Sequence, residues 1–291
     1  MSDSELSVSP ASCPSSPMSV SSSDIPKPRK QFQLLREETE AALAPRPQRD
    51  PTLPPPIVVA LDADIATGKS SVLAWAAAHL RTKGFTVAEG PEPVSVWQES
   101  GILPLYYGDR ERHGMEFQNF VATTRIDEMT AIYEADPNVD IILLERTLFT
   151  DRFVFVRDLS EAGLVTDMQL AMYNRSWTAQ LRMMPFQISG FIWLEADMPL
   201  LMKRLRGRGR EGEEALTEEI QYGLREKHRQ FFELLREPAQ IGLPANVRST
   251  KVCVNEDYRT HVAEPGSADH KERVEKQTEF CERLAAWITS I

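Results

Sequence analysis

Residues 57–71 (IVVALDADIATGKSS) restrict the possible folds of this chain more than any other segment. The apolar run at 57–61 is rich in β-branched residues and lacks a helical period, which is typical of a parallel strand buried on both faces. Gly68, Lys69 and Ser70 follow at the spacing of a phosphate-binding loop that leads into a helix. Backbone N–H groups of such a loop, and the positive end of the helix, face the phosphates of a nucleotide. The segment therefore predicts an α/β domain that binds a nucleotide.

The residues of this loop have expected places around the phosphates. Lys69 is expected to bridge them, and the Ser70 hydroxyl is expected to bind Mg²⁺. The residues expected at the phosphates are Ala63, Asp64, Ile65, Ala66, Thr67, Gly68, Lys69, Ser70 and Ser71. Ala63 replaces the usual first glycine and would be strained at a positive φ. The Asp64 carboxylate points either to solvent or inward, where it would weaken nucleotide binding.

The composition argues against several other classes of protein. A net charge of −10 is unfavourable for wholesale nucleic-acid binding, and no apolar run approaches the roughly 18 residues of a membrane span. Cys13, Cys253 and Cys281 lie far apart, without the spacing of a metal site or a disulfide framework, which favours a reducing compartment. We therefore expect neither nucleic acid nor a membrane among the partners.

The first 55 residues differ in composition from the rest. Residues 1–26 are rich in Ser and Pro and should be disordered; residues 31–44 have helical periodicity, and a proline-rich linker follows. We expect a disordered tail and linker over 1–55 and one folded domain over 56–291. The tail lacks the features of a transit or signal peptide, and residues 27–30 (KPRK) are a weak nuclear import signal or a solvated cluster. A cytoplasmic location is predicted, with nuclear import left open and a mitochondrial location disfavoured.

Strand-like and helix-like segments alternate along the domain. Strands are predicted at 57–61, 85–88, 139–144, 190–194 and 249–254. Helices are predicted at 69–83, 116–134, 166–184, 198–206, 217–236 and 270–288. This alternation predicts a three-layer α/β fold, with a five-stranded parallel sheet flanked by helices.

Charged residues follow two of the predicted strands, at the edge of the sheet where α/β sites form. Glu92 lies between two prolines after the second strand, where it is either a general base or a solvated loop residue. Glu145 closes the third strand, within reach of Mg²⁺, and Arg146 could place a planar cation on phosphoryl or acceptor oxygens. Asp151 and Arg152 follow one turn later. The alternative for these charged residues is an exposed ion pair, but charges that follow a buried apolar strand favour a function.

Two further segments carry groups suited to a nucleotide or nucleoside. Residues 203–210 hold five basic residues among mobile glycines, which suits a lid over phosphates; an RNA-binding patch is the alternative, and the acidic chain argues against it. Phe117 and Gln118 share a helix face with Arg125, seven residues on, and could stack on and hydrogen-bond a base. Taken alone, such a Phe is more often part of a core.

Taken in order, these motifs resemble the deoxynucleoside kinase family over about residues 57–262. The matching segments are 63–70, 91–94 (PEPV), 145–147 (ERT), 204–213 and 254–258 (VNEDY). The resemblance implies a P-loop kinase fold with an arginine-rich lid. It also implies phosphoryl transfer from ATP, or another NTP, to the 5′-hydroxyl of a deoxynucleoside in nucleotide salvage, with Mg²⁺.

The resemblance also implies roles for individual residues. Four residues would take part in phosphoryl transfer: Glu92 as the general base, Arg146 at the acceptor end, Lys69 at the phosphates and Glu145 near Mg²⁺. At the deoxynucleoside the residues are Tyr107 and Glu213 (sugar 3′-hydroxyl), Gln118 (base edge), and Phe117 and Phe155 (around the base). At the donor they are Arg204, Arg208 and Arg210 (phosphates), with Asp257 and Tyr258 (donor base).

The pair Arg125 and Asp151 bears on the choice of substrate. In the deoxycytidine and deoxyguanosine kinase branch, the corresponding pair lies near the exocyclic groups of the base. A charged pair that loses its partner costs roughly 1–3 kcal/mol. We therefore expect purine deoxynucleosides and deoxycytidine to be preferred over thymidine.

Two other functions stay open at this point. One is a catalytically silent member of the same fold, against which the presence of Lys69, Glu92 and the lid arginines argues. The other is a nucleoside-monophosphate kinase, although an acid such as Glu92 beside an acceptor phosphate would repel it.

Apolar residues on two predicted helices raise the question of oligomeric state. The helices at 116–134 and 166–184 carry more of them than one core needs; those singled out are Met168, Leu170, Met172, Leu181, Met183 and Met184. The family packs such helices into a homodimer, which we expect here, although the same faces could also be internal core.

Overall fold

The structure is a computed structural model that describes residues 39–40, 42–210, 213–256, 258–259 and 262–291. The chain divides into two compact units, Met1–Arg46 and Pro47–Ile291. The predicted tail at 1–26 lies outside the described residues, as does most of the helix predicted at 31–44. The sheet and its helices belong to the second unit.

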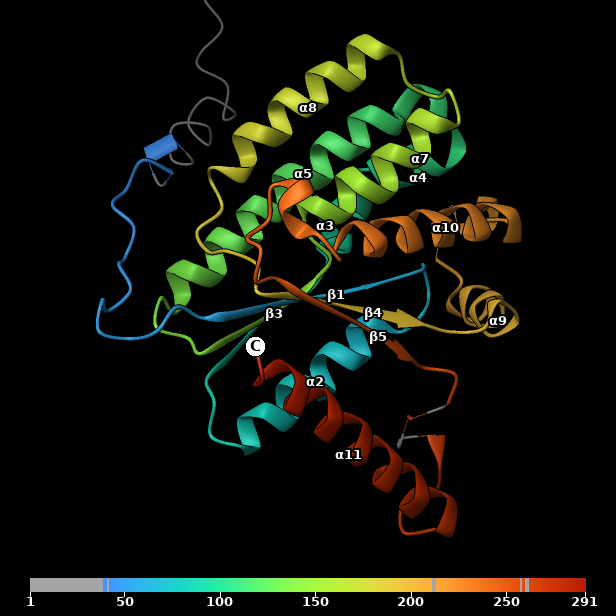
Figure 1. The fold of residues 1–291 in the computed structure, drawn as a ribbon. Helices are drawn as coiled ribbons and strands as arrows, with labels where there is room; N and C mark the ends of the chain where they lie inside the picture. The colour runs from blue at the N-terminus through green and yellow to red at the C-terminus, as the bar shows by residue number, and fades with distance from the viewer. Residues whose placement is uncertain (1–38, 41, 211–212, 257, 260–261) are drawn as a thin grey trace, which may run out of the picture. The chain divides into compact units, whose positions relative to one another are not determined.

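Five parallel strands form the central sheet of this unit (Figure 1). They are β1 (Ile57–Ala63), β2 (Val87–Gly90), β3 (Ile141–Glu145), β4 (Gly190–Glu195) and β5 (Arg248–Cys253), in the spatial order β2-β3-β1-β4-β5. All five predicted strands are present, and so is the predicted three-layer α/β fold. In the β1–β3 register, Leu61 lies opposite Glu145, so both strands deliver their carboxyl ends to one edge.

Helices cover both faces of the sheet, as Figure 1 shows. On one face lie α2 (Lys69–Thr82) and α11 (Ala268–Ile288), and on the other lie α5 (Arg110–Ala135), α8 (Asp167–Leu181) and α10 (Glu218–Leu234). The side chains of successive residues in β1 point alternately to the two faces of the sheet. Val59 and Leu61 pack in the cluster with α2 and α11, whereas Val58 and Ala60 pack in the cluster with α5 and α10.

The sequence did not predict several short helical segments near the edge of the sheet. These are α3 (Val94–Glu99), α4 (Ile102–Gly108), α6 (Leu148–Thr150), the π-turn η1 (Asp151–Phe155) and α7 (Val156–Glu161). Each is too short to show a periodic pattern, and α4 even contains a proline. The predicted helix at 116–134 begins earlier, at Arg110, because Asp109 caps it by accepting a hydrogen bond from the Arg112 backbone N–H.

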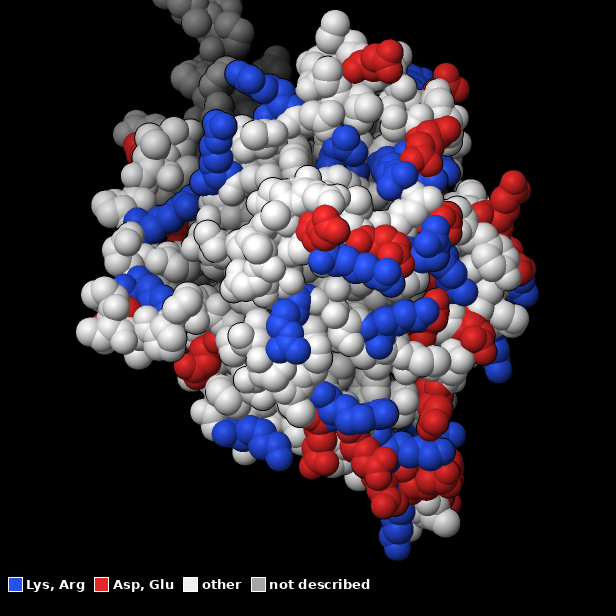
Figure 2. All heavy atoms as spheres, viewed as in Figure 1, with Lys and Arg blue, Asp and Glu red and all other residues white. Residues whose placement is uncertain are grey.

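The helix predicted at 198–206 is present as α9 (Met198–Arg208). The short 3-10 segments η2 (Glu213–Ala215) and η3 (Pro238–Ile241) were not predicted. No helix in the described part of the chain is long and apolar enough to span a bilayer. On the face in Figure 2, basic and acidic side chains are interspersed, and acidic ones gather toward the lower end, where α11 begins.

Candidate active site

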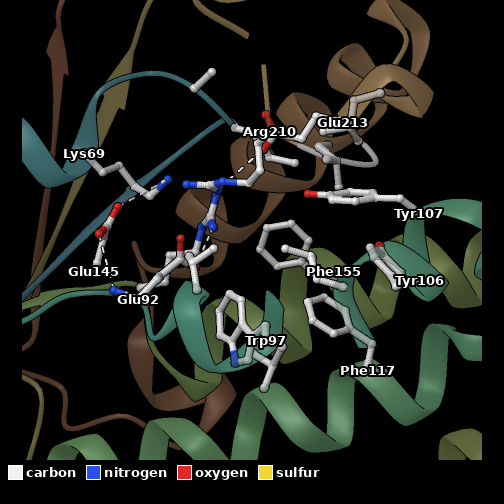
Figure 3. Close-up of a pocket in the computed structure, with 18 of the residues that line it drawn as sticks. Lys69, Glu92, Trp97, Tyr106, Tyr107, Phe117, Glu145, Phe155, Arg210 and Glu213 are labelled. Atoms are coloured by element: carbon white, nitrogen blue, oxygen red, sulfur yellow. Dashed lines mark hydrogen bonds and ion pairs between the residues drawn. The ribbon is translucent and has the colours of Figure 1, made fainter. Parts of the chain in front are cut away.

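A cavity of about 260 Å³ opens at the carboxyl edge of the sheet. Most of the residues predicted to form the site line it: Ile65, Ala66, Gly68, Lys69, Ser70, Glu92, Tyr107, Phe117, Gln118, Arg125, Glu145, Arg146, Asp151, Phe155, Arg208, Arg210 and Glu213. Figure 3 shows charged groups such as Lys69, Glu145 and Glu92 on one side and aromatic rings on the other. One end of the cavity therefore suits phosphate and the other suits a flat ring.

The phosphate loop turns at Ala66 and Gly68. Both have a left-handed backbone, with φ of 68° and 103°, and Gly68 directly precedes α2. Ala63 is the last residue of β1 and has no positive φ, so the strain considered for it does not arise. The glycine-like conformation falls on Ala66 instead, where a non-glycine residue stores of order 1–3 kcal/mol of strain.

The Asp64 side chain points inward, but toward a cation. It is fully buried, and its Oδ2 lies 2.7 Å from the guanidinium of Arg225 in α10. The alternative in which Asp64 points to solvent is therefore wrong, and the positive charge of Arg225 pairs with the inward carboxylate. Arg225 was not singled out in the sequence because nothing local to α10 connects it to the loop.

Ser70 and Glu145 are neighbours at the start of α2 and the end of β3. The Ser70 Oγ lies 3.0 Å and 3.1 Å from the two carboxylate oxygens of Glu145, and the Lys69 Nζ lies 3.9 Å from Glu145 Oε1. A hydroxyl and a carboxylate are the hard oxygen donors that Mg²⁺ prefers, so this pair fits the ion. Burial, together with the nearby Arg146, lowers the pKa of Lys69, against the pull of Glu92 and Glu145.

Two guanidinium groups meet one oxygen of Glu92. Arg146 donates from Nη1 over 2.6 Å and Arg125 from Nη2 over 2.9 Å, both to Oε1. Burial alone would raise the pKa of Glu92, but Arg146, Lys69 and Arg125 outweigh it and hold the pKa well below its ordinary value. Glu92 is therefore an ionised, oriented carboxylate rather than a solvated loop residue.

Arg125 also pairs with Asp151, which comes from the unpredicted π-turn. Its Nε lies 2.7 Å from Asp151 Oδ2, and its Nη1 donates to the Glu145 carbonyl over 2.7 Å. Burial raises the pKa of the Asp151 carboxyl to about 6, although Arg125 opposes it. Asp151 Oδ1 and Gln118 Oε1 are buried without a hydrogen-bond partner, and both residues line the cavity. Unpaired buried acceptors in cavity-lining residues are candidates for hydrogen bonds from a ligand.

Aromatic rings enclose the other end of the cavity (Figure 3). Phe117 stacks on Tyr106, with ring centroids 4.5 Å apart, and meets the edge of Trp97 at 5.6 Å. Phe155 lies beneath the guanidinium of Arg146, 4.8 Å from its ring centroid. Tyr106 was not among the predicted residues, because a lone Tyr in a short helix gives no periodic signal.

The predicted lid arginines have specific partners. Arg208 donates to both carboxylate oxygens of Glu213, and Arg210 lies 3.5 Å from Glu213 Oε1. Arg204 donates to the Thr67 carbonyl over 2.7 Å, which ties α9 to the phosphate loop. Burial and the nearby Glu213 raise the pKa of Tyr107, so its hydroxyl keeps its proton.

A second cavity, of about 730 Å³, lies on the other side of the phosphate loop. Thr67, Ser71, Arg204 and Tyr258 line it, together with Trp75, which the sequence did not single out. Trp75 meets the edge of Tyr258 at a centroid distance of 6.4 Å, and Tyr258 stacks on Phe280. Asp257, predicted at the donor base, lies outside the described residues.

Comparison with known proteins identifies the family. A family model described as "Deoxynucleoside kinase" matches residues 59–281. The chain belongs to the deoxynucleoside kinase family. It is thus an enzyme, a kinase, as the resemblance implied.

The similar proteins are nucleoside kinases at low identity. A probable deoxycytidine kinase of fowlpox virus is 27% identical over 173 residues, 60% of this chain and 70% of that protein. The deoxycytidine kinase of Mus musculus is 23% identical over 249 residues, 78% of this kinase and 91% of that protein. Mitochondrial thymidine kinase 2 of Homo sapiens is 25% identical over 178 residues, 60% of this kinase and 63% of that protein.

Proposed function

We propose that this kinase transfers the γ-phosphoryl group of ATP to the 5′-hydroxyl of a deoxynucleoside, in nucleotide salvage. The observation that carries the proposal is Glu92, an ionised carboxylate fixed by two guanidinium groups where the phosphate loop meets an aromatic cavity. The acceptor would lie in the 260 Å³ cavity and the donor across the loop in the 730 Å³ cavity.

In this reaction, the acceptor 5′-oxygen forms a bond to the γ-phosphorus while the bond from that phosphorus to the β–γ bridging oxygen breaks, which leaves ADP. Glu92 Oε2 accepts no hydrogen bond from the described residues and can orient the 5′-hydroxyl. With so low a pKa, Glu92 takes the proton late, which suffices because phosphoryl transfer depends mainly on positioning and electrostatics. Lys69 and Arg146 supply positive charge on either side of the transferred group.

Ser70 and Glu145 would hold Mg²⁺ beside the phosphates. When bound, the ion would neutralise phosphate charge that develops on the leaving ADP. The direct bond between the two residues keeps both oxygens at the mouth of the loop.

The acceptor preference we propose is for purine deoxynucleosides and deoxycytidine over thymidine. Asp151 Oδ1 and Gln118 Oε1 are unpartnered acceptors that suit an exocyclic amino group, and Arg125 holds Asp151 in place. The relatives include both deoxycytidine and thymidine kinases, so the preference depends on these side chains.

The same cavity disfavours a monophosphate acceptor. The carboxylates of Glu92 and Glu213 line it and would repel an acceptor phosphate. A silent member of the fold is also disfavoured, because Lys69, Glu92 and Glu145 are present and lie together on the charged side of the site (Figure 3).

We also propose a homodimer built on α8. Met168 and Met172 of this helix are 70% and 66% exposed, and Met183 just after it is 52% exposed. Exposed methionines on one element suit an adaptable apolar contact with a second copy. The cytoplasmic location stays a prediction from the sequence.

Assays of the purified kinase would test the function. The protein is incubated with ATP or UTP and each of the four deoxynucleosides, with deoxycytidine monophosphate as the phosphorylated acceptor. We expect deoxynucleoside monophosphates from deoxycytidine and the purines, and no product from the monophosphate. Absence of any product with all four deoxynucleosides would contradict the proposal.

A further inference from the structure

One face of α10 contacts the end of β1 and the phosphate loop at three points. Gln221, Arg225 and His228 are four and three residues apart, so they share this face. Gln221 Nε2 donates to the Ile65 carbonyl over 3.1 Å, Arg225 Nε donates to Asp64 Oδ2 over 2.7 Å, and His228 Nε2 lies 2.9 Å from Asp62 Oδ1. The helix thus holds the end of β1 and the first half of the loop through separate bonds.

This set of residues is buried. Asp62, Asp64, Gln221 and His228 are fully buried, and the Arg225 side chain is 19% exposed. Buried charges are tolerated only when paired and hydrogen-bonded. The pairs are therefore specific features of this site rather than solvated surface contacts.

Both ring nitrogens of His228 lie within hydrogen-bond distance of an oxygen. Its Nδ1 lies 2.9 Å from the Leu224 carbonyl, and its Nε2 lies beside the Asp62 carboxylate. A carbonyl and an ionised carboxylate are both acceptors, and His228, Arg146 and Thr150 hold the pKa of Asp62 below its ordinary value, although burial alone would raise it. Acceptors from α10 and from β1 therefore hold the two ring nitrogens of His228 in place.

Two carboxylates and two basic side chains meet at this point. Asp62 and Asp64 lie next to the loop, and Arg225 and His228 reach them from α10. Asp64 Oδ1 lies 3.6 Å from His228 Nδ1 and its Oδ2 binds Arg225, so both side chains face it. Without them, two carboxylates at the foot of the loop would oppose the phosphates of a nucleotide.

We propose that Gln221, Arg225 and His228 are positioning residues that hold the phosphate loop in its binding form, and that Arg225 neutralises Asp64 so that the loop accepts donor phosphates. The inference rests on the proposed function, since the ligand it concerns is the donor. None of the three residues needs to touch the nucleotide, and the effect passes through the loop.

A charge-matched pair of substitutions tests this role. Arg225→Gln keeps a hydrogen-bond donor beside Asp64 but removes the positive charge. We therefore expect the Kd for Mg·ATP and the KM for ATP to rise by about tenfold. The KM for the deoxynucleoside should change by less than about twofold, since the acceptor end keeps its contacts. Adding Asp64→Asn in the same chain should restore ATP affinity, because a neutral amide pair replaces the ion pair.

A control lies one turn further along the same helix. Arg229 is exposed and bonds Glu226 within α10, so Arg229→Gln should leave ATP affinity unchanged. The proposal would be overturned if Arg225→Gln weakened the affinities for ATP and for the deoxynucleoside equally, or if Asp64→Asn did not restore ATP affinity. Arg225 would then have only a general packing role.

The test also separates the inference from the proposed function. Amide hydrogen exchange at residues 63–68 needs neither catalysis nor acceptor, and we expect it to quicken in Arg225→Gln but not in Arg229→Gln. Unchanged exchange in Arg225→Gln would overturn the inference even if the kinase is active. Faster exchange in a protein that phosphorylates no deoxynucleoside would support the inference and contradict the function.

Discussion

Arg146 donates a hydrogen bond of 2.6 Å to Glu92, and its own backbone has a conformation that non-glycine residues rarely adopt. Its φ of 65° lies in the left-handed region, and its guanidinium also donates to the Ala63 carbonyl over 2.9 Å. Strain of this kind persists where surrounding bonds over-determine a residue, and it gathers at functional sites. Here the strained residue joins the Ala63 carbonyl, at the end of β1, to the carboxylate of Glu92, which follows β2.

Replacing Glu92 tests its role as the acceptor base. Glu92→Gln keeps a hydrogen-bond acceptor for Arg146 but cannot take a proton, so we expect kcat to fall by about 10²–10⁴-fold. The KM for the deoxynucleoside should change little. Steady-state kinetics with deoxycytidine measure both. Glu89→Gln is the control, because Glu89 of β2 is partly exposed and pairs with Arg81 of α2. A variant with more than a tenth of the wild-type kcat would refute the assignment.

The pH dependence of acceptor binding should follow Asp151. Its pKa is about 6, so the carboxyl is ionised at pH 7 and becomes protonated as the pH falls through 6. Protonation removes the charge that pairs with Arg125, and we expect the KM for deoxycytidine to rise between pH 7 and pH 5. In Asp151→Asn this rise in KM toward low pH should be absent. A wild-type KM that stays constant over this range, or a rise that persists in the variant, would exclude Asp151 as the titrating group.

Discrimination against thymidine should depend on the Arg125–Asp151 pair. Arg125→Met together with Asp151→Ala removes the pair as a unit and leaves no buried charge between them. We expect thymidine use relative to deoxyadenosine to rise by about one to two decades, which corresponds to roughly 1–3 kcal/mol. Competition assays with both substrates measure the ratio, and an unchanged ratio would rule out this basis for selectivity.

The sequence predicted the strands and most of the site because their signals are local. The run 57–71 contains a strand, a loop and a helix start, and Glu145-Arg146 follows a buried strand directly. Phe155 was implied by the resemblance alone, and Asp151 was singled out only as a charge after a buried strand, since the π-helix that orients them leaves no periodic trace. The bonds from α10 to the loop join residues more than 150 positions apart, such as Asp64 and Arg225, and depend on packing that no local pattern encodes.

The junction of β4 and the end of α11 offers a test of the fold. Gly190 begins β4, and a Cβ there would lie 2.9 Å from both Trp287 and Ile291 and 3.1 Å from the Arg248 carbonyl. Overpacking of this kind typically costs about 1–3 kcal/mol, so Gly190→Ala should lower the free energy of unfolding by about that amount. Urea denaturation followed by circular dichroism measures it.

Gly223 in α10 is the matched control for that substitution. The nearest atom to its added Cβ is Asp158 Oδ1 at 3.7 Å, which is ordinary contact, and its backbone is helical. Alanine favours a helix interior over glycine by about 0.8–1 kcal/mol, so Gly223→Ala should raise stability while Gly190→Ala lowers it. If both substitutions shifted stability in the same direction, the close approach of α11 to β4 would not be what excludes a side chain at Gly190.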